Sequence, residues 1–173
     1  MSREIWKSVV GFEGIYEVSN LGQVRSLDRI DDGGAHRFGI LKKATLSDKG
    51  YMRVTLTKGG VQRHHSVHTL VLNAFTGSKP IGTEAAHDNG IRNDNRDSNL
   101  FWKTPTANNK DRRRHGTLPM GETHPGAKIS EVTARLIKAR LIGEPLSRDV
   151  AAEFHISKHI VDAIRSGRSW THL

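Results

Sequence analysis

The chain has 173 residues, and its 27 lysines and arginines exceed its 18 aspartates and glutamates, giving a net charge of +9. Cysteine is absent, which excludes disulfides and thiolate zinc sites. A positive surplus of this size attracts polyanions such as nucleic acid, although solvated surface charge alone would give the same composition. No apolar run of ~18 residues is present and the N-terminus lacks the apolar core of a signal peptide, so we expect a cytoplasmic protein.

Residues 1–76 are expected to be mostly strand. Residues 15–19 alternate in polarity and lead through the turn Asn20-Leu21-Gly22 into residues 23–27, which predicts a hairpin. A second hairpin is predicted from residues 51–56 and 61–67, separated by Gly59-Gly60. Residues 68–75 carry apolar side chains at helical spacing, so a short helix should follow.

Residues 77–116 contain few apolar side chains and many turn formers. Two short apolar segments, Ala85-Ala86 and Leu100-Phe101-Trp102, flank a polar loop, and a helix is predicted from Pro105 to Arg114. The result is a strand-loop-strand-helix unit with almost no core of its own. A metal ion held between strand and helix could supply the missing stability.

The C-terminal part is predicted to be helical and follows a linker. Residues 117–128 are rich in proline and glycine and predict a flexible or extended spacer, which could also follow a DNA groove. Beyond it, Ser130, Ser147 and Ser157 are candidate caps of three helices. The apolar faces expected for these helices are, in order, Val132, Leu136 and Ala139; then Val150, Ala151 and Phe154; then Ile160, Val161 and Ile164.

The second and third of these helices have the size and pattern of a helix-turn-helix. His155 stands in the turn, where a left-handed backbone is common and histidine is tolerated. Residues 103–173 carry 13 basic and 7 acidic side chains, so this half should make the larger electrostatic contribution to binding.

The polar loop after Ala86 suggests hydrolysis of a phosphodiester. A histidine with a pKa near 6.5 can take the proton from an attacking water, and His87 begins the loop. Mg²⁺ held by hard oxygen ligands can polarise the phosphate, and the asparagines and aspartates that follow are suitable ligands.

In the order of its segments, the chain resembles the HNH nucleases, in particular the homing endonucleases of phage type. The run from Glu4 to Val24 resembles their small N-terminal module, and Val67 to Phe75 resembles the segment that leads into their nuclease site. The C-terminal helices are similar to their DNA-reading helix-turn-helix. The resemblance covers most of the chain.

The resemblance implies roles for residues at matching positions. His87 would be the general base, Asn99 the middle asparagine that braces the loop and orients the histidine, and Asn108 a metal ligand on the helix. The residue before the base is often a further metal ligand in this family, but here it is Ala86, which cannot ligate.

Three explanations for Ala86 are open: another oxygen substitutes, the chain is a weak or inactive relative, or the alanine is an engineered change. Asp111 is the favoured substitute, because it lies one turn after Asn108 on the same helix face. Its alternative role is a salt bridge with Arg112, Arg114 or another basic side chain. Asp88 is a rival ligand, but a turn cap is the preferred interpretation for it.

DNA contacts are expected from three basic groups. On the last helix, Ser157, Lys158 and His159 would read bases, while Arg165 and Arg168 would contact phosphates. The other candidates are Lys42, Lys43 and Arg53 near the N-terminal module and Arg112, Arg113 and Arg114 on the helix of the nuclease site.

The sequence thus predicts a modular α+β chain. Its parts are a strand-rich, DNA-contacting module over 1–76, a strand-strand-helix (ββα-metal) HNH site over 77–116, a linker over 117–128 and a helix-turn-helix over 129–173. The expected activity is site-specific cleavage of double-stranded DNA with Mg²⁺ or Mn²⁺ by a monomer, in the host cell of a phage or mobile element. The alternatives are a weakened or inactive DNA-binding relative, or a nuclease that needs partner proteins.

Overall fold

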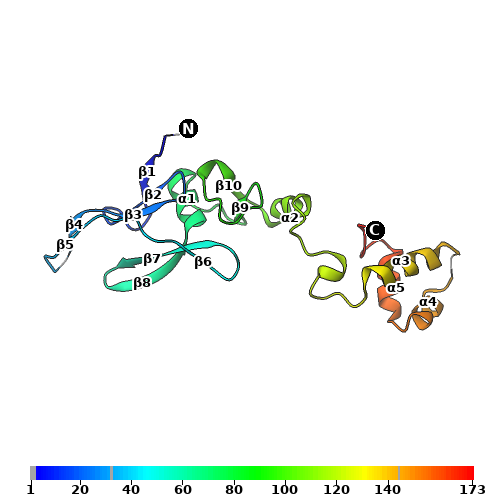
Figure 1. The fold of residues 1–173 in the computed structure, drawn as a ribbon. Coiled ribbons are helices and arrows are strands. Elements are labelled where there is room, and N and C mark those ends of the chain that lie inside the picture. The colour runs from blue at the N-terminus through cyan, green and yellow to red at the C-terminus, as the bar shows by residue number, and fades with distance from the viewer. Residues whose placement is uncertain (1–2, 32, 144) are drawn as a thin grey trace. The chain divides into compact units, whose positions relative to one another are not determined.

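The computed structural model describes residues 3–31, 33–143 and 145–173 and has a mixed α+β fold, as predicted. The chain divides into two compact units, one ending at Thr117 and the other spanning Leu118–Leu173 (Figure 1). The first unit contains all the strands and two helices, and the second is helical.

Two three-stranded antiparallel sheets and two short ribbons make up the strands of the first unit. The first sheet contains β1 (Trp6–Ser8), β2 (Tyr16–Ser19) and β3 (Val24–Ser26), and the second contains β6 (Thr45–Leu46), β7 (Met52–Lys58) and β8 (Val61–Ser66). The ribbons are β4 (Arg29–Ile30) with β5 (His36–Arg37), and β9 (Glu84–His87) with β10 (Leu100–Lys103). Both predicted hairpins are confirmed, as β2–β3 and β7–β8.

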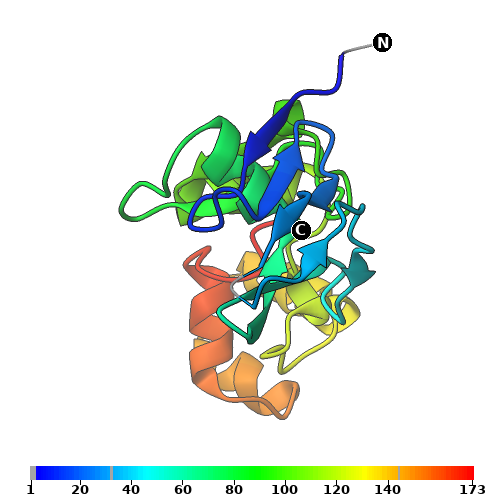
Figure 2. The ribbon, with the colours of Figure 1, turned by 90° about the vertical axis from the view of Figure 1, so that its left-hand side faces the viewer.

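The first unit has one hydrophobic core, centred on helix α1 (Val67–Phe75). Helix α1 contacts β1, β2, β7, β9 and β10, and it lies beside the blue strands in both ribbon views (Figure 1 and Figure 2). Leu72 and Val71 of α1 are fully buried with Leu56 of β7 and Leu100 of β10. The two apolar segments around the polar loop therefore reach this common core through β9 and β10.

Helix α2 (Pro105–Arg114) is separated from the end of β10 by one residue and spans the residues predicted for it. The Thr104 side chain caps it by accepting a hydrogen bond from the Ala107 N–H, and Pro105 occupies the first turn, where no N–H is needed. No residue of α2 is fully buried. The helix is thus positioned by the strand before it and by polar contacts.

The turn of the first hairpin packs against the polar loop between β9 and β10. The Asp97 N–H donates to the Asn20 carbonyl over 2.9 Å. Gly22 has a φ of +81°, and a Cβ there would stand 2.7 Å from the Asn95 Cβ. Only glycine fits this left-handed, closely approached position. The N-terminal strands and the loop after His87 are therefore in direct contact.

The second unit contains α3 (Glu131–Arg140), α4 (Ser147–Glu153) and α5 (Lys158–Arg165). Its core is formed by Ile137, Val150, Ala151, Val161 and Ile164, so the predicted faces of α4 and α5 are confirmed. His155 between α4 and α5 has a φ of +53°, the left-handed conformation that the turn requires.

The predicted apolar face of the first C-terminal helix was wrong. Val132, Leu136 and Ala139 are exposed, whereas Ala134 and Ile137 are buried. Helix α3 carries apolar side chains on two sides, and the one that packs against α5 is buried.

Of the three predicted caps, only Ser130 makes the expected bond, accepting from the Thr133 N–H over 3.2 Å. Ser147 is not a cap, because α4 starts at it and Leu146 holds the cap position. Ser157 holds the cap position of α5 without a side-chain hydrogen bond. Within the expected linker, a Cβ on Gly121 would stand 2.9 Å from the Trp170 ring, so this part of the segment packs against the C-terminal end of the second unit, to which it belongs.

No helix in the parts of the chain that the structure describes is long and apolar enough to cross a membrane.

Replacing Gly22 by alanine should lower the free energy of unfolding of the first unit by about 1–3 kcal/mol through backbone strain, and further through the clash with Asn95. Gly11→Ala is the matched control, because Gly11 has a φ of +82° but a Cβ there would meet nothing within 4 Å. Denaturant unfolding of both variants measures the difference. Equal destabilisation would show that the contact with Asn95 contributes nothing.

Candidate functional site

His87 is the last residue of β9 and lies at the start of the polar loop, only 8% exposed. It pairs with Leu100 of β10 in the ladder, so the strand fixes its backbone. The loop that follows has almost no apolar residues of its own. Polar contacts must therefore hold the loop in place if His87 is to stay buried.

The Asn99 side chain supplies much of that support. Its Oδ1 accepts the Asn89 N–H over 3.0 Å, and its Nδ2 donates to the Asp94 carbonyl over 2.8 Å. Its own carbonyl accepts the Asp88 N–H over 2.9 Å. Asn99 therefore ties both ends of the loop together, which agrees with the bracing expected of it. It does not orient the His87 ring as expected, because the side chain that bonds this ring is another asparagine.

The histidine ring itself is held by Asn95, which the sequence pattern indicates only as a turn residue. Asn95 Oδ1 lies 3.3 Å from His87 Nε2, and Asn95 Nδ2 donates to the Asn93 carbonyl over 3.2 Å. The second bond fixes the amide orientation, so Nε2 of His87 carries the proton and donates. The Nδ1 atom is then the basic nitrogen.

Two further rings pack around His87. His68 of α1 meets it in a T-shaped contact with centroids 5.2 Å apart, and Tyr51 lies 5.9 Å away and also contacts His68. Among the described residues, His68 Nδ1 is buried without a hydrogen-bond partner. Burial, with a smaller contribution from His87, lowers the pKa of His68 to about 4, so its ring is neutral at pH 7.

Burial is also the largest influence on His87 and lowers its pKa. The hydrogen bond with Asn95 and the charge of Asp94 act in the opposite direction, while Arg92 adds to the lowering. The net effect keeps the ring neutral at neutral pH, the state in which a histidine can accept a proton.

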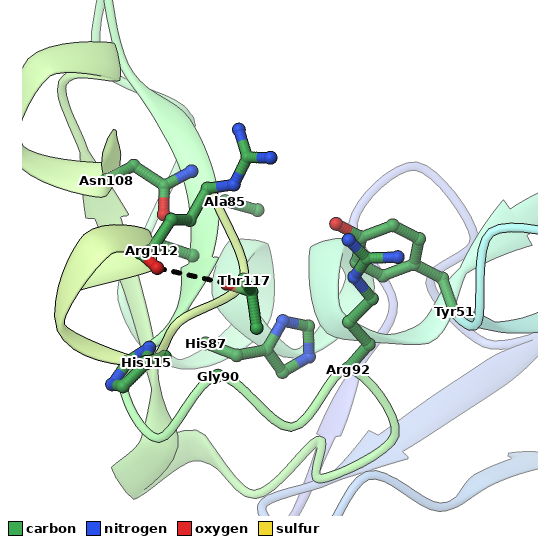
Figure 3. A pocket seen from close by; sticks show the side chains of 10 residues that line it. Tyr51, Ala85, His87, Gly90, Arg92, Asn108, Arg112, His115 and Thr117 are labelled. Carbon is green, nitrogen blue, oxygen red and sulfur yellow. Dashed lines mark hydrogen bonds between the residues drawn. The ribbon is translucent and has the colours of Figure 1, made fainter. Parts of the chain in front are cut away.

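A shallow pocket opens beside His87, between β9, the loop and α2 (Figure 3). It is lined by Tyr51, Ala85, Ala86, His87, Gly90, Arg92, Asn108, Arg112, His115 and Thr117. The guanidinium groups of Arg92 and Arg112 give it positive charge and suit it to an anion such as phosphate. His87 and Asn108, two of the residues singled out from the sequence, thus line the same pocket, whereas Asn99 is not among its lining residues.

The Asn108 side chain, which lines the pocket from α2, contacts a carboxylate of β9 that is not among the lining residues. Asn108 Nδ2 donates to Glu84 Oε1 over 2.7 Å, which links α2 to β9. Ala86 is buried, 3% exposed, and offers no ligand atom. Sequence reasoning misses Glu84 as a site residue, because only the pairing of strand and helix brings it to Asn108.

Asp111 and Asp88 share a single lysine. Lys103 Nζ lies 2.6 Å from Asp111 Oδ2 and 2.7 Å from Asp88 Oδ1, and Arg114 lies 3.2 Å from Asp111 Oδ1. The hydrogen bond with Lys103 is the largest cause that lowers the pKa of both carboxyls. The arrangement favours the salt-bridge alternative for Asp111 over the role of metal ligand.

Most of the basic residues expected to contact DNA lie on the surface. Lys43, Arg53, Arg113 and Arg114 are exposed, Lys42 and Arg112 are half-buried, and of these Arg112 lines the pocket. In the second unit Ser157, Lys158, His159, Arg165 and Arg168 are all exposed. Lys158 pairs with Asp162 over 2.7 Å, and Arg165 donates to the Pro145 carbonyl.

Comparison with known proteins relates the chain to nucleases. Residues 4–57 match the family described as the NUMOD4 motif. The DNA endonuclease I-HmuI of Bacillus phage SP01 is 33% identical over 124 residues, which is 72% of this chain and 66% of the relative. An uncharacterized HNH endonuclease, L245 of Acanthamoeba polyphaga mimivirus, is 30% identical over 97 residues, 56% of this chain and 26% of the relative. The chain spans less than two thirds of the length of either.

A solved structure described as DNA binding and cleavage by the HNH homing endonuclease I-HmuI has a similar fold. Its TM-score is 0.57 at 24% identity, and the match covers 94% of this chain and 90% of that chain. The sequence relatives confirm the resemblance to HNH homing endonucleases of phage type that the order of segments indicated, and the solved structure shows a similar fold.

The half-buried His68 should make the stability of the first unit dependent on pH. Between pH 6.5 and about 4 the unfolded chain binds a proton that the folded chain does not, so the free energy of unfolding falls as the pH falls through this range. The loss should be on the order of 1–3 kcal/mol. Denaturant unfolding at several pH values measures it.

His68→Phe should reduce this pH dependence, since phenylalanine keeps a ring and removes the group with the larger shift, and the lowered pKa of His87 leaves a smaller slope. Tyr51→Phe is the control, because it alters the same ring cluster and leaves the imidazole in place. A slope as steep as that of the unaltered protein would assign the pH dependence to other groups.

Proposed function

We propose that this chain, a relative of the HNH homing endonucleases of phage type, is a site-specific endonuclease that hydrolyses phosphodiester bonds in double-stranded DNA. The observation that carries the proposal is the buried, neutral His87, whose ring is fixed by Asn95 beside a pocket lined by Arg92 and Arg112. A base next to a cationic pocket suits attack of water on a phosphate.

In the proposed reaction, His87 Nδ1 takes the proton of a water molecule as its oxygen attacks phosphorus. A new P–O bond forms, and the bond to the leaving oxygen of the DNA backbone breaks. The imidazolium that results keeps its Nε2 hydrogen bond to Asn95 Oδ1, so the ring does not turn during the transfer. Arg92 and Arg112 are available to offset the charge that develops on the phosphate.

HNH endonucleases generally use divalent metal ions, and the donors present here fit a hard cation with few protein ligands. Asn108, whose side chain lines the pocket, carries an amide oxygen, and Asp111 is the second candidate if it is released from Lys103. The described residues hold no cluster of three or more histidines and carboxylates arranged for a metal. Mg²⁺ commonly uses one or two protein ligands together with water and phosphate, so we propose Mg²⁺ or Mn²⁺. Such an ion would polarise the phosphate and stabilise the leaving oxygen.

The exposed basic residues are proposed to hold DNA on either side of the cut. Lys42, Lys43 and Arg53 would contact the backbone from the N-terminal module over 1–76, and Arg112, Arg113 and Arg114 would do so beside the site over 77–116. In the second unit α4 and α5 would act as a helix-turn-helix, with Ser157, Lys158 and His159 facing base edges and Arg165 and Arg168 on phosphates. One chain would carry all of these contacts, so a monomer is proposed.

A second candidate function is DNA binding without efficient cleavage, and Ala86 is the observation that favours it. Incubation of supercoiled plasmid with the protein and Mg²⁺ or Mn²⁺, compared with EDTA, separates the two functions. Metal-dependent nicked or linear product supports the endonuclease. Binding of the same plasmid without any product would support the DNA-binding relative.

His87→Ala should lower the cleavage rate by about 10²–10⁴-fold and leave DNA affinity nearly unchanged, since a general base acts only in the chemical step. Cleavage is measured in a single turnover, and affinity on the same duplex in EDTA. His64→Ala, which removes an exposed histidine of β8, is the control and should cut at the normal rate. A His87 variant that cuts as fast as the control would refute the assignment of the base.

Deleting residues 118–173 should leave a folded first unit, because its hydrophobic core contains no residue beyond 117. The truncated chain should lose most of its preference for a cognate duplex. Its affinity should depend less steeply on salt, by about 0.9 in the log–log slope for each phosphate contact removed. Binding to cognate and scrambled duplexes at several salt concentrations tests this. An unchanged slope with unchanged preference would mean that α4 and α5 serve another partner.

A further inference from the structure

The loss of a ligand atom at Ala86 leaves strand β9 with one carboxylate on the same face. Side chains two residues apart on a strand point to the same side, so Glu84 shares the face of Ala86. Glu84 is exposed, and its Oε1 accepts a hydrogen bond from Asn108 Nδ2 over 2.7 Å. The carboxylate therefore already touches the helix residue that would hold a metal.

The three carboxylates around α2 differ in their partners. Asp88 and Asp111 are both bound by Lys103, and Asp111 is also bound by Arg114. Within the described part of the chain, no lysine, arginine or histidine nitrogen lies within 4.0 Å of the Glu84 carboxylate. Metal binding by Asp111 would break contacts with cations, whereas metal binding by Glu84 would cost only one amide hydrogen bond.

We infer that Glu84 and Asn108 together form the protein half of a divalent-cation site, with Glu84 replacing the ligand that Ala86 cannot supply. The inference rests on the proposed nuclease function and names the metal ligand for it. The Asn108 amide keeps nearly the same shape when it rotates by 180° about its Cβ–Cγ bond, and this rotation exchanges the positions of Nδ2 and Oδ1. A cation repels the NH₂ group and attracts the carbonyl oxygen, so it favours the turned amide.

The spacing of the two groups suits such an ion. After the turn, the Asn108 oxygen takes the place of the nitrogen that now lies 2.7 Å from the Glu84 oxygen. Mg²⁺–oxygen bonds of about 2.0–2.1 Å in an octahedron put neighbouring ligand oxygens about 2.9 Å apart. Glu84 and Asn108 thus fit two adjacent positions and leave the others for water and phosphate.

The test is a titration of the full chain with Mn²⁺ in the absence of DNA, with free Mn²⁺ measured by electron paramagnetic resonance. Glu84→Gln keeps the size of the side chain and its ability to accept the bond from Asn108, and removes the charge. It should weaken Mn²⁺ binding about tenfold or more, because even indirect partners of a metal contribute 10–100-fold. Asp111→Asn tests the rival ligand and should change the affinity less than twofold, as should Asp48→Asn, the control, which removes an exposed carboxylate elsewhere in the first unit.

A second variant covers the case in which Glu84→Gln alters the local structure as well as metal binding. Adding Ala86→Asp to the Glu84→Gln chain returns a carboxylate to the same strand face and should restore Mn²⁺ affinity. Circular dichroism verifies that each chain is folded. Unchanged affinity in Glu84→Gln, a loss in Asp111→Asn instead, or no saturable Mn²⁺ site in the unaltered chain would overturn the inference.

Plasmid cleavage is measured separately, so that failure of the proposed nuclease function can be told from failure of the proposed metal pair. A chain that binds Mn²⁺ through Glu84 but does not cut would overturn the nuclease and leave the metal pair. A chain that cuts, and whose Glu84→Gln variant keeps its Mn²⁺ affinity, would overturn the metal pair and leave the nuclease.

Discussion

The hydrogen bonds of the Asn99 amide hold the candidate site together. Residues 88–99 offer almost no apolar surface, so the loop after His87 cannot be fixed by hydrophobic packing. Asn99 binds the loop at Asn89 and Asp94 and is itself only 7% exposed. A buried backbone group left without such a partner costs about 1–3 kcal/mol, which is large for a loop with no core. The position of His87, and of everything that faces it, follows from this bracing.

The N-terminal strands take part in the same support. Asn20 accepts a hydrogen bond from the loop at Asp97, and Gly22 closes against Asn95, which in turn holds the His87 ring. Helix α1 adds His68 from the other side. Whatever DNA contacts the first 76 residues make, they also form part of the frame that orients the proposed base. A change in the hairpin turn can therefore alter the chemical step without touching a substrate.

The sequence predicts those features that depend on neighbours along the chain. Gly59 and Gly60 predict the turn of a hairpin whatever the two strands pack against. Thr104 and Pro105 predict the start of a helix, because the cap needs only bonds between neighbouring residues. Helix α3 has apolar residues on two sides, so its buried side is decided by α5 and the prediction failed there. In the site, resemblance pointed to His87, Asn99 and Asn108, but Asn95 and Glu84 were missed. Their roles come from contacts across the fold that no local pattern contains.

The charges around His87 also explain how one ring could be neutral before the reaction and basic during it. Burial lowers its pKa, while Asn95 and Asp94 raise it and Arg92 lowers it, so no single group decides its state. In the proposed reaction a DNA phosphate enters the pocket beside this ring and brings negative charge, which stabilises the imidazolium. A bound divalent cation would destabilise the imidazolium, and more strongly the closer it lay to the ring. If the cation is held at Asn108, as proposed, the Nδ1 atom of His87 stays free to accept the proton of the water.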